Sequence, residues 1–286
     1  MTAAQAPTAL PLPSGCDGLV LDLDGVVYRG AAAVPGSVEA LAALAAADVP
    51  VGYATNNASR SPADVAGHLS DLGIPTSPDQ VVTSAQVAAE LLLDLVPRGA
   101  LVLVVGGSGL REAVLAEGFR LAADAENAPA AVVQGFGPDT SWRDLAEATY
   151  AVRAGAVWIA ANTDLTFPTE RGNAPGNGTF VAAVSAASGC VPVVAGKPAP
   201  ALLRATARRV GARRALVVGD RLDTDIVGAK AAGLPSALVL SGVTTAADLA
   251  AASADEQPDI VAPDLLALVE GRWWPAPVPV PLPPRR

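Results

Sequence analysis

The sequence predicts an α/β fold, because short apolar runs alternate along it with alanine-rich helical stretches. Its 286 residues are 51% hydrophobic and 16% charged, enough for a sizeable core in one large or two ordinary domains. Alternation of this kind makes a mostly parallel sheet with helices on both faces. The strands are predicted at 18–23, 49–54, 101–105, 131–134, 157–161, 215–218 and 236–240.

Local signals mark the helices between these strands. Val38, Leu41 and Leu44 recur at helical spacing after the first strand. The segment Ser61–Asp64 offers an N-cap, a proline at the first helical position and an acid in the first turn. We expect the helix that begins there to end at Gly73.

The overall charge limits the classes of partner. Nineteen basic and 28 acidic residues give a formal net charge of −9, which disfavours a general nucleic-acid coat. No stretch approaches the roughly 20 apolar residues of a membrane helix, and the first fifteen residues make a poor signal peptide. Cys16 and Cys190 form no disulfide or zinc pattern. We therefore expect a cytoplasmic protein that binds neither nucleic acid nor membrane.

An acidic motif follows the first predicted strand. Asp22-Leu23-Asp24-Gly25 places two carboxylates where the chain leaves the sheet. Open α/β sheets bind ligands just outside the carboxyl ends of their strands. Crowded carboxylates repel unless a cation intervenes. Taken alone, this motif fits a calcium loop or a plain turn equally well.

Three further segments follow strands or begin helices. Thr55-Asn56-Asn57 offers a hydroxyl and backbone amides, and Gly196-Lys197-Pro198 places a lysine before a helix. Gly219–Asp225, with the sequence GDRLDTD, adds an acid cluster. Each of these residues alone is explained by a cap, a turn or a surface position. The ordered set of four segments favours a catalytic site.

These four segments resemble the motifs of the haloacid dehalogenase-like phosphohydrolases, here LVLDLDGVV, YATNN, AGKPAP and VVGDRLDTDI. GDRLDTDI and the long insert before the third motif are similar to class II, subtype A, the NagD-like branch. Within it, TNNASR, ANTDLTFPTERG and PGNGT most resemble the actinobacterial glycerol 3-phosphate phosphatases. The longer members of that group carry an additional C-terminal domain, which we expect to be absent here.

The resemblance implies a Rossmann-like core with a parallel sheet and an inserted α/β cap of the C2 type. The core is expected over 1–83 and 191–272 and the cap over 84–190, where it closes over the site and excludes water. Residues 273–286 are proline-rich and are expected to form a polyproline tail. Trp273 and Trp274 are expected to pin that tail to the surface.

The residue chemistry and the resemblance assign the same catalytic roles. Asp22 is the expected nucleophile, and Asp24 the expected general acid and base. A carboxylate that approaches a phosphate dianion needs its repulsion neutralised, which suits Mg²⁺. The expected ligands are Asp22, the backbone carbonyl of Asp24, and Asp220.

The remaining motif residues are expected to bind and support the phosphoryl group. Thr55 and the backbone amides of Asn56 and Asn57 hold its oxygens, and Lys197 offsets their charge. Asp225 is expected to orient Lys197 or a water of the metal site, rather than to bind metal directly. Asp223 shares that role or caps the next helix.

Within the insert, the resemblance makes residues 162–170 a candidate substrate-facing loop. Asn162 and Asp164 are candidate substrate-binding residues there, and Asp164, Glu170 and Arg171 are candidate contacts of the leaving group. Ordinary loop polarity explains all four residues about as well. Pro175–Gly178 is predicted to form a tight loop.

Two other features have structural interpretations. Gly106–Gly109 looks like a dinucleotide-binding turn, but the third glycine of that pattern is missing, so we interpret it as a structural turn. His68 lies on a predicted helix away from every motif, which favours a packing or surface residue over a catalytic base.

The sequence thus predicts a Mg²⁺-dependent phosphatase acting on a small phosphorylated metabolite, with glycerol 3-phosphate as the favoured substrate. Phosphoglycolate, a sugar phosphate, pyridoxal phosphate and a nucleotide remain alternatives. A phosphomutase or a non-catalytic phosphate-binding module are competing functions. Resemblance to relatives that pair through their caps also suggests a homodimer.

Overall fold

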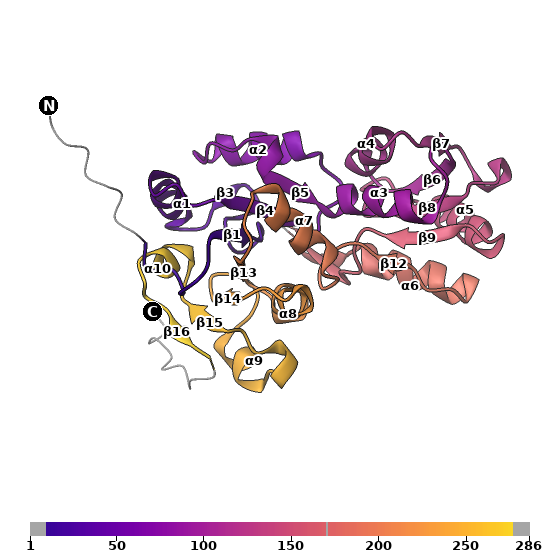
Figure 1. The fold of residues 1–286 in the computed structure, drawn as a ribbon. Coiled ribbons are helices and arrows are strands. Elements are labelled where there is room, and N and C mark those ends of the chain that lie inside the picture. The colour runs from indigo at the N-terminus through magenta and orange to yellow at the C-terminus, as the bar shows by residue number, and fades with distance from the viewer. Residues whose placement is uncertain (1–9, 170, 277–286) are drawn as a thin grey trace, which may run out of the picture. The chain divides into compact units, whose positions relative to one another are not determined.

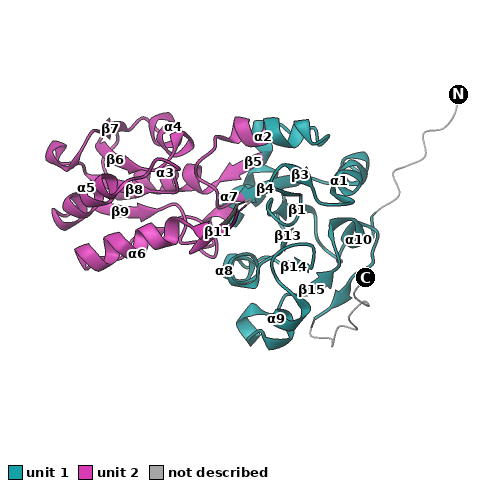
Figure 2. Cartoon of the chain, turned by 180° about the vertical axis from the view of Figure 1, so that it is seen from behind, with its two compact units in different colours: residues 1–54, 67–80, 203–286 teal, residues 55–66, 81–202 magenta. Residues whose placement is uncertain are grey.

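A computed structural model describes residues 10–169 and 171–276 and confirms the α/β fold class (Figure 1). The chain divides into two compact units (Figure 2). Unit 1 contains the described parts of 1–54, 67–80 and 203–286, and unit 2 contains those of 55–66 and 81–202. Each unit has its own mostly parallel sheet.

The sheet of unit 1 places β1 between β13 and β4, and all three strands are parallel. Its strands follow the order β16-β15-β14-β13-β1-β4, and the β15–β16 pair is antiparallel. They are β1 (Gly18–Leu21), β4 (Val51–Thr55), β13 (Ala215–Gly219), β14 (Ser236–Val239), β15 (Ile260–Ala262) and β16 (Trp274–Pro275). β1, β4, β13 and β14 are buried along their whole length, which explains why their sequences are mostly apolar.

Helices surround this sheet, and a small hairpin follows β1. The helices are α1 (Ser37–Ala46), η1 (Pro78–Gln80), the π-helix η3 (Leu222–Ile226), α8 (Val227–Ala232), α9 (Ala246–Ala251), η4 (Ala254–Glu256) and α10 (Leu265–Val269). The hairpin pairs β2 (Tyr28–Arg29) with β3 (Ala32–Ala33). The chain passes between the units within α2 (Pro62–Asp71) and α7 (Ala201–Arg209).

Unit 2 has a five-stranded parallel sheet in the order β12-β9-β8-β6-β7. The strands of this sheet are β6 (Leu101–Val105), β7 (Arg120–Ala122), β8 (Ala131–Gln134), β9 (Val157–Ala160) and β12 (Val193–Val194). Outside this sheet, unit 2 also contains β5 (Val81–Thr83) and a hairpin of β10 (Thr166–Thr169) and β11 (Gly172–Pro175). Its helices are α3 (Ser84–Leu95), α4 (Ser108–Ala116), η2 (Ala125–Asn127), α5 (Trp142–Arg153) and α6 (Asn177–Ser188).

One core of unit 2 lies between the strands and two helices. Trp158 and Val132 on the strands pack with Ala148 and Val152 of α5 and with Val184 of α6, all of them buried. The helix α3 begins with a capping box, in which the Thr83 hydroxyl accepts from the Gln86 N–H and the Gln86 side chain accepts from the Thr83 N–H. Both helix capping and apolar burial therefore stabilise this unit.

All seven predicted strands are present, with ends that differ by at most two residues. The helix predicted from Ser61 is also confirmed as α2, which begins at Pro62. The sequence analysis missed short strands such as β7 and β15, because three residues are too few to show a period.

The fold also bears on several isolated predictions. His68 packs edge-on against Tyr28, with their rings 5.0 Å apart. Gly106–Gly109 joins β6 to the first residues of α4 and has a packing role, since a Cβ at Gly109 would lie 2.5 Å from the Arg60 carbonyl carbon. The Trp273 indole donates to the Pro11 carbonyl at 3.1 Å, and residues 277–286 of the predicted tail lie outside the described residues. No helix in the described part of the chain is long and apolar enough to cross a bilayer.

Candidate active site

Three carboxylates meet at the carboxyl edge of the unit 1 sheet. Asp22 follows β1 and Asp220 follows β13, its neighbour in the sheet, while Asp225 lies in η3. One oxygen of each carboxylate lies within 4.8 Å of the others. Asp220 and Asp225 are each only 1% exposed, and Asp22 is half-buried. We call Asp22, Asp220 and Asp225 the acid cluster.

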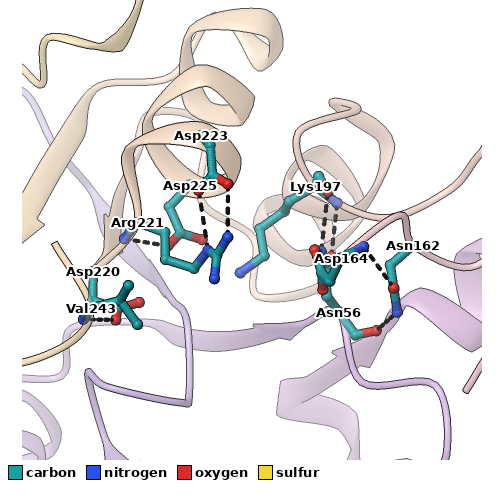
Figure 3. A network of polar contacts seen from close by, with 9 residues as sticks. All are labelled: Asn56, Asn162, Asp164, Lys197, Asp220, Arg221, Asp223, Asp225 and Val243. Atoms are coloured by element: carbon teal, nitrogen blue, oxygen red, sulfur yellow. Dashed lines mark hydrogen bonds and ion pairs between the residues drawn. The ribbon is translucent and has the colours of Figure 1, made fainter. Parts of the chain in front are cut away.

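Main-chain groups and glycines hold Asp220 in place. Its Oδ2 accepts from the Val243 N–H at 2.6 Å (Figure 3). A Cβ at Gly242 or at Gly25 would collide with the same oxygen, so both positions leave room only for hydrogen. Gly25 also has a φ of +83°, in the region that favours glycine. The glycine of the Asp-x-Asp-Gly motif therefore serves both the turn and the carboxylate beside it.

Asp225 is supported in a similar way. Its Oδ2 accepts from the Arg221 N–H at 3.1 Å, and a Cβ at Gly219 would overlap its side chain. The Arg221 guanidinium bonds Asp223 at 2.7 Å, and that Asp223 side chain is 61% exposed. An ion pair so open to water contributes little to stability. Asp223 therefore lies outside the acid cluster, on the surface of the same helix (Figure 3).

The acid cluster fits a divalent cation that prefers oxygen ligands. Three carboxylates this close repel one another, and burial of two of them strengthens that repulsion. Mg²⁺ is bound in proteins by a few carboxylates, with waters and substrate phosphate completing its octahedron. The Asp24 side chain is exposed and does not belong to this group of described carboxylates. Asp24 is expected to bind the metal through its backbone carbonyl instead.

Thr55 ends β4, the strand beside β1, and its side chain is only 3% exposed. Its hydroxyl accepts from the Asn57 N–H at 3.1 Å. The Asn57 side chain in turn accepts from the Ser59 N–H at 2.9 Å and from the Ser59 hydroxyl at 2.7 Å. The turn after β4 is thus ordered by its own side chains, with the Asn57 carboxamide oxygen engaged locally.

A second polar cluster lies within unit 2, around Asn56 and Lys197. The Asn56 Oδ1 accepts from the Lys197 N–H at 2.8 Å, and the Asn56 Nδ2 donates to the Lys197 carbonyl at 3.1 Å. The same Nδ2 donates to both oxygens of Asp164, each at 3.2 Å. Lys197 is 3% exposed. Together with Asn162 and Asn177, these residues form what we call the amide cluster. Figure 3 shows its members Asn56, Asn162, Asp164 and Lys197.

Further side chains of unit 2 secure the backbone of the amide cluster. The carbonyl of Asn56 accepts from Asn162 Nδ2 and from the Ser84 hydroxyl, both at 2.7 Å. Asn177, the first residue of α6, donates to the Asn162 carbonyl at 2.6 Å. Sequence reasoning missed Ser84 and Asn177, although Asn177 lies within the PGNGT segment that supported the family resemblance.

Two expectations for the insert are corrected. Pro175–Gly178 is not a separate tight loop but the end of β11 joined to the start of α6. The predicted loop at 162–170 contains the strand β10, because residues 166–169 pair with β11 in a hairpin that was too short to show a period. Asn162 and Asp164 precede this hairpin and Arg171 lies in its turn, while Glu170 falls outside the described residues.

Family models and similar proteins of known name all point to one family of hydrolases. The model of the haloacid dehalogenase-like hydrolases matches residues 19–120, and a HAD-hydrolase-like model matches residues 194–268. A D-glycerol 3-phosphate phosphatase of Mycobacterium tuberculosis is 50% identical over 252 residues, which cover 88% of this chain and 70% of the relative. The chain belongs to the haloacid dehalogenase-like hydrolases.

Other relatives of this hydrolase agree. An acid sugar phosphatase of Staphylococcus saprophyticus is 37% identical over 79% of this chain and 87% of its own length. A crystal structure of glycerol phosphate phosphatase from Mycobacterium tuberculosis in complex with magnesium has a TM-score of 0.85 at 50% identity, covering 89% of this chain and 77% of that one. A 4-nitrophenylphosphatase from Thermotoga maritima has a TM-score of 0.82 at 34% identity, covering 89% and 96%.

The structure of the hydrolase therefore brings seven of its predicted site residues into two groups, whereas Asp24, Thr55 and Asn57 belong to neither. Asp22, Asp220 and Asp225 gather in unit 1. Asn56, Asn162, Asp164 and Lys197 gather in unit 2, joined by side-chain amides.

Proposed function

We propose that this hydrolase is a Mg²⁺-dependent phosphatase of small phosphomonoesters, which acts through an aspartyl-phosphate on Asp22. The observation that carries the proposal is the acid cluster, in which a half-buried aspartate lies beside two buried ones at a strand edge. The relatives described above are named as phosphatases, which supports the same reaction.

Asp22, Asp220 and the backbone carbonyl of Asp24 are the proposed metal ligands, with Asp225 beside them. When bound, Mg²⁺ neutralises the charge that would otherwise keep a carboxylate away from a phosphate dianion. Asp225 lies within 4.8 Å of the other two carboxylates, so it is near enough to bind the metal or to orient a ligand water. The donor set consists of oxygens, as a hard cation requires.

The proton transfers are assigned to Asp24. A carboxylate oxygen of Asp22 attacks phosphorus in line, and the bond to the leaving oxygen breaks as Asp24 donates a proton to it. The resulting Asp24 carboxylate then takes a proton from water, whose oxygen attacks the phosphorus of the aspartyl-phosphate. Asp22 is released as carboxylate together with inorganic phosphate. The exposed position of Asp24 gives it access to both the leaving group and water.

Thr55, the backbone amides of Asn56 and Asn57, and Lys197 are proposed to bind the phosphoryl oxygens. The Asn57 N–H would exchange its bond to the Thr55 hydroxyl for one to phosphate. Donors aimed at those oxygens stabilise the charge that spreads over them in the transition state. Residues 84–190 are proposed to act as the cap that excludes water. The contacts that select the leaving group are proposed to lie in this cap as well.

Glycerol 3-phosphate is the proposed substrate. The support is the 50% identity to a phosphatase named for it, over 88% of this chain. Phosphoglycolate, sugar phosphates, pyridoxal phosphate and nucleoside monophosphates are the competing substrates, and the acid sugar phosphatase relative favours sugar phosphates among them. A cytoplasmic location and a homodimer formed through the cap complete the proposal.

Phosphate release from a panel of these esters, with and without Mg²⁺, tests the function. We expect metal-dependent release that is fastest with glycerol 3-phosphate and is lost in Asp22→Asn. Fastest release from another ester would retain the chemistry and reject the substrate. No release from any ester would reject the phosphatase in favour of a phosphomutase or a binding module, and transfer between phosphorylated positions of a sugar would identify the mutase.

A further inference from the structure

The Asn56 carboxamide binds the main chain of Lys197 on both sides of that residue. Its oxygen accepts from the Lys197 N–H at 2.8 Å, and its nitrogen donates to the Lys197 carbonyl at 3.1 Å. One planar amide thus fixes the peptide groups before and after Lys197, which limits how the residue can rotate (Figure 3). The lysine and the amide lie 141 positions apart in the sequence.

Asp164 decides which way that carboxamide faces. A carboxylate only accepts hydrogen bonds, so it requires the NH₂ end of Asn56, whose nitrogen lies 3.2 Å from each Asp164 oxygen. The Asn56 oxygen must then face the Lys197 N–H. With this orientation both hydrogens of the NH₂ group have acceptors. The flipped orientation would place two oxygens together at Asp164 and two donors together at Lys197.

Neighbouring residues of unit 2 hold Asn56 in place beside Lys197. The Asn56 carbonyl accepts from Asn162 and from Ser84, so its backbone is fixed as well as its side chain. A Cβ at Gly196 would lie 2.6 Å from the Asn56 Oδ1, so the residue before Lys197 leaves space for the carboxamide because it is a glycine. The contact between Asn56 and Lys197 is therefore built from several sides within unit 2.

We propose that Asn56 is a positioning residue for Lys197, and that Asp164 acts on the lysine through Asn56 instead of serving as a substrate contact. The inference rests on the proposed role of Lys197 in binding the phosphoryl group. It departs from the expectation for Asp164, whose carboxylate is engaged with the Asn56 amide. The side chain of Asn56 thereby links the segment that follows Thr55 to the main chain of Lys197.

A double-mutant cycle between Asn56→Ala and Lys197→Ala tests this role. Phosphate release from glycerol 3-phosphate and from 4-nitrophenyl phosphate is measured at saturating Mg²⁺. Misplacement of a catalytic group by about 1 Å costs on the order of 10²-fold, so we expect kcat of Asn56→Ala to fall by about that factor equally for both esters. On the Lys197→Ala background, Asn56→Ala should cause little further loss. Additive losses, or a KM increase confined to one ester, would overturn the proposal.

Asp164 supplies a graded comparison. Asp164→Asn keeps an oxygen that can accept from Asn56, so it should retain most of the kcat, whereas Asp164→Ala should resemble Asn56→Ala. Asn127→Ala is the matched control, since that exposed asparagine bonds only its own turn among the described contacts and should leave kcat unchanged. Equal losses in Asp164→Asn and Asp164→Ala for glycerol 3-phosphate alone would make Asp164 a substrate contact and refute the proposal.

Hydrogen exchange of the Lys197 amide gives a readout that does not depend on turnover. The amide should exchange slowly in the wild-type protein and much faster in Asn56→Ala, with other amides of unit 2 unchanged. If the wild-type protein hydrolyses no ester but this difference is seen, the proposed function fails while the contact holds. If exchange is the same in both proteins, Asn56 does not hold Lys197.

Discussion

The acid cluster and the amide cluster are built on opposite principles. The first gathers three like charges, two from neighbouring strand ends of unit 1 and one from η3, held by main-chain N–H groups and by glycines. The second gathers neutral amides with one carboxylate and one lysine, from segments that are far apart in the sequence of unit 2. The amides bond one another and the backbone, whereas the carboxylates repel.

Because of this difference, we expect the acid cluster to depend on a metal ion and the amide cluster not to. Because its charges repel, the acid cluster depends on a cation and on space for that cation. The amide cluster is ordered by its own hydrogen bonds, so its geometry should not depend on metal. Perturbations of the first are therefore expected to respond to Mg²⁺ concentration, and perturbations of the second are not.

The largest expected effect follows from replacing the Asp22 carboxylate of the acid cluster by a carboxamide. Asp22→Asn removes the nucleophilic oxygen anion, so turnover should fall by at least about 10⁴-fold, as for other nucleophile replacements. Mg²⁺-dependent phosphate release measures the loss, and circular dichroism checks that the fold is retained. Residual hydrolysis well above that level in a clean preparation would show that Asp22 is not the nucleophile.

A smaller effect is expected from crowding a carboxylate of the acid cluster. In Gly242→Ala the new Cβ collides with the Asp220 Oδ2, so the carboxylate must move. Displacing the support of a metal ligand typically costs about 10- to 100-fold in affinity or activity. Activity measured against Mg²⁺ concentration should show a higher metal requirement that excess Mg²⁺ largely satisfies.

The control for that substitution is Gly67→Ala, in the middle of α2, where a Cβ meets nothing within 4 Å. It should leave the Mg²⁺ dependence unchanged and raise the free energy of unfolding by about 0.5–1 kcal/mol, the usual gain from replacing glycine by alanine inside a helix. An unchanged Mg²⁺ requirement in Gly242→Ala would mean that Asp220 does not bind the metal.

The matching change in the amide cluster is Gly196→Ala. Its Cβ would lie 2.5 Å from the Ala161 carbonyl oxygen and 2.6 Å from the Asn56 Oδ1, so Lys197 must shift. We expect a loss of about 10-fold in kcat from this smaller displacement. Titration with Mg²⁺ should not restore it. Recovery at high Mg²⁺ would show that the two clusters are not independent in the way proposed.

The smallest effect concerns an acid of unit 1 outside the acid cluster. The Asp17 carboxylate accepts from the N–H groups of Arg213 and Arg214 at 2.9 and 2.8 Å, and these bonds lower the pKa of Asp17 below its usual value. Since the folded pKa lies below the unfolded value of about 3.9, its stabilisation is present above that pH and is lost as the pH falls through the folded pKa.

Thermal unfolding of Asp17→Asn and of the wild-type protein, measured without Mg²⁺ between neutral and acid pH, checks this expectation. The neutral carboxamide of the variant cannot accept with two anionic oxygens, so the variant should melt slightly lower at neutral pH. The two melting temperatures should converge as the pH falls below about 4. A gap that widens toward acid pH would contradict the assignment.

Local patterns accounted for most of the fold and for the acid cluster. Buried parallel strands need uninterrupted apolar sequence, so runs such as 101–105 and 131–134 could be located without a structure. Asp22 and Asp220 follow two such strands directly, and parallel strands end at one edge, so their proximity could be expected. Strands of two or three residues and the hairpin at 166–175 carry no comparable period.

The sequence by itself therefore determined the α/β class, the order of the main strands, the family motifs and the acids at the strand ends, because each depends on residues adjacent in the chain. Only the tertiary structure decided that the side chain of Asn56 bonds Lys197 and Asp164, and that Ser84 and Asn177 support this arrangement. Those contacts join segments up to 141 residues apart. The direction of a carboxamide is set by whichever partners the fold brings to it, and no local pattern records them.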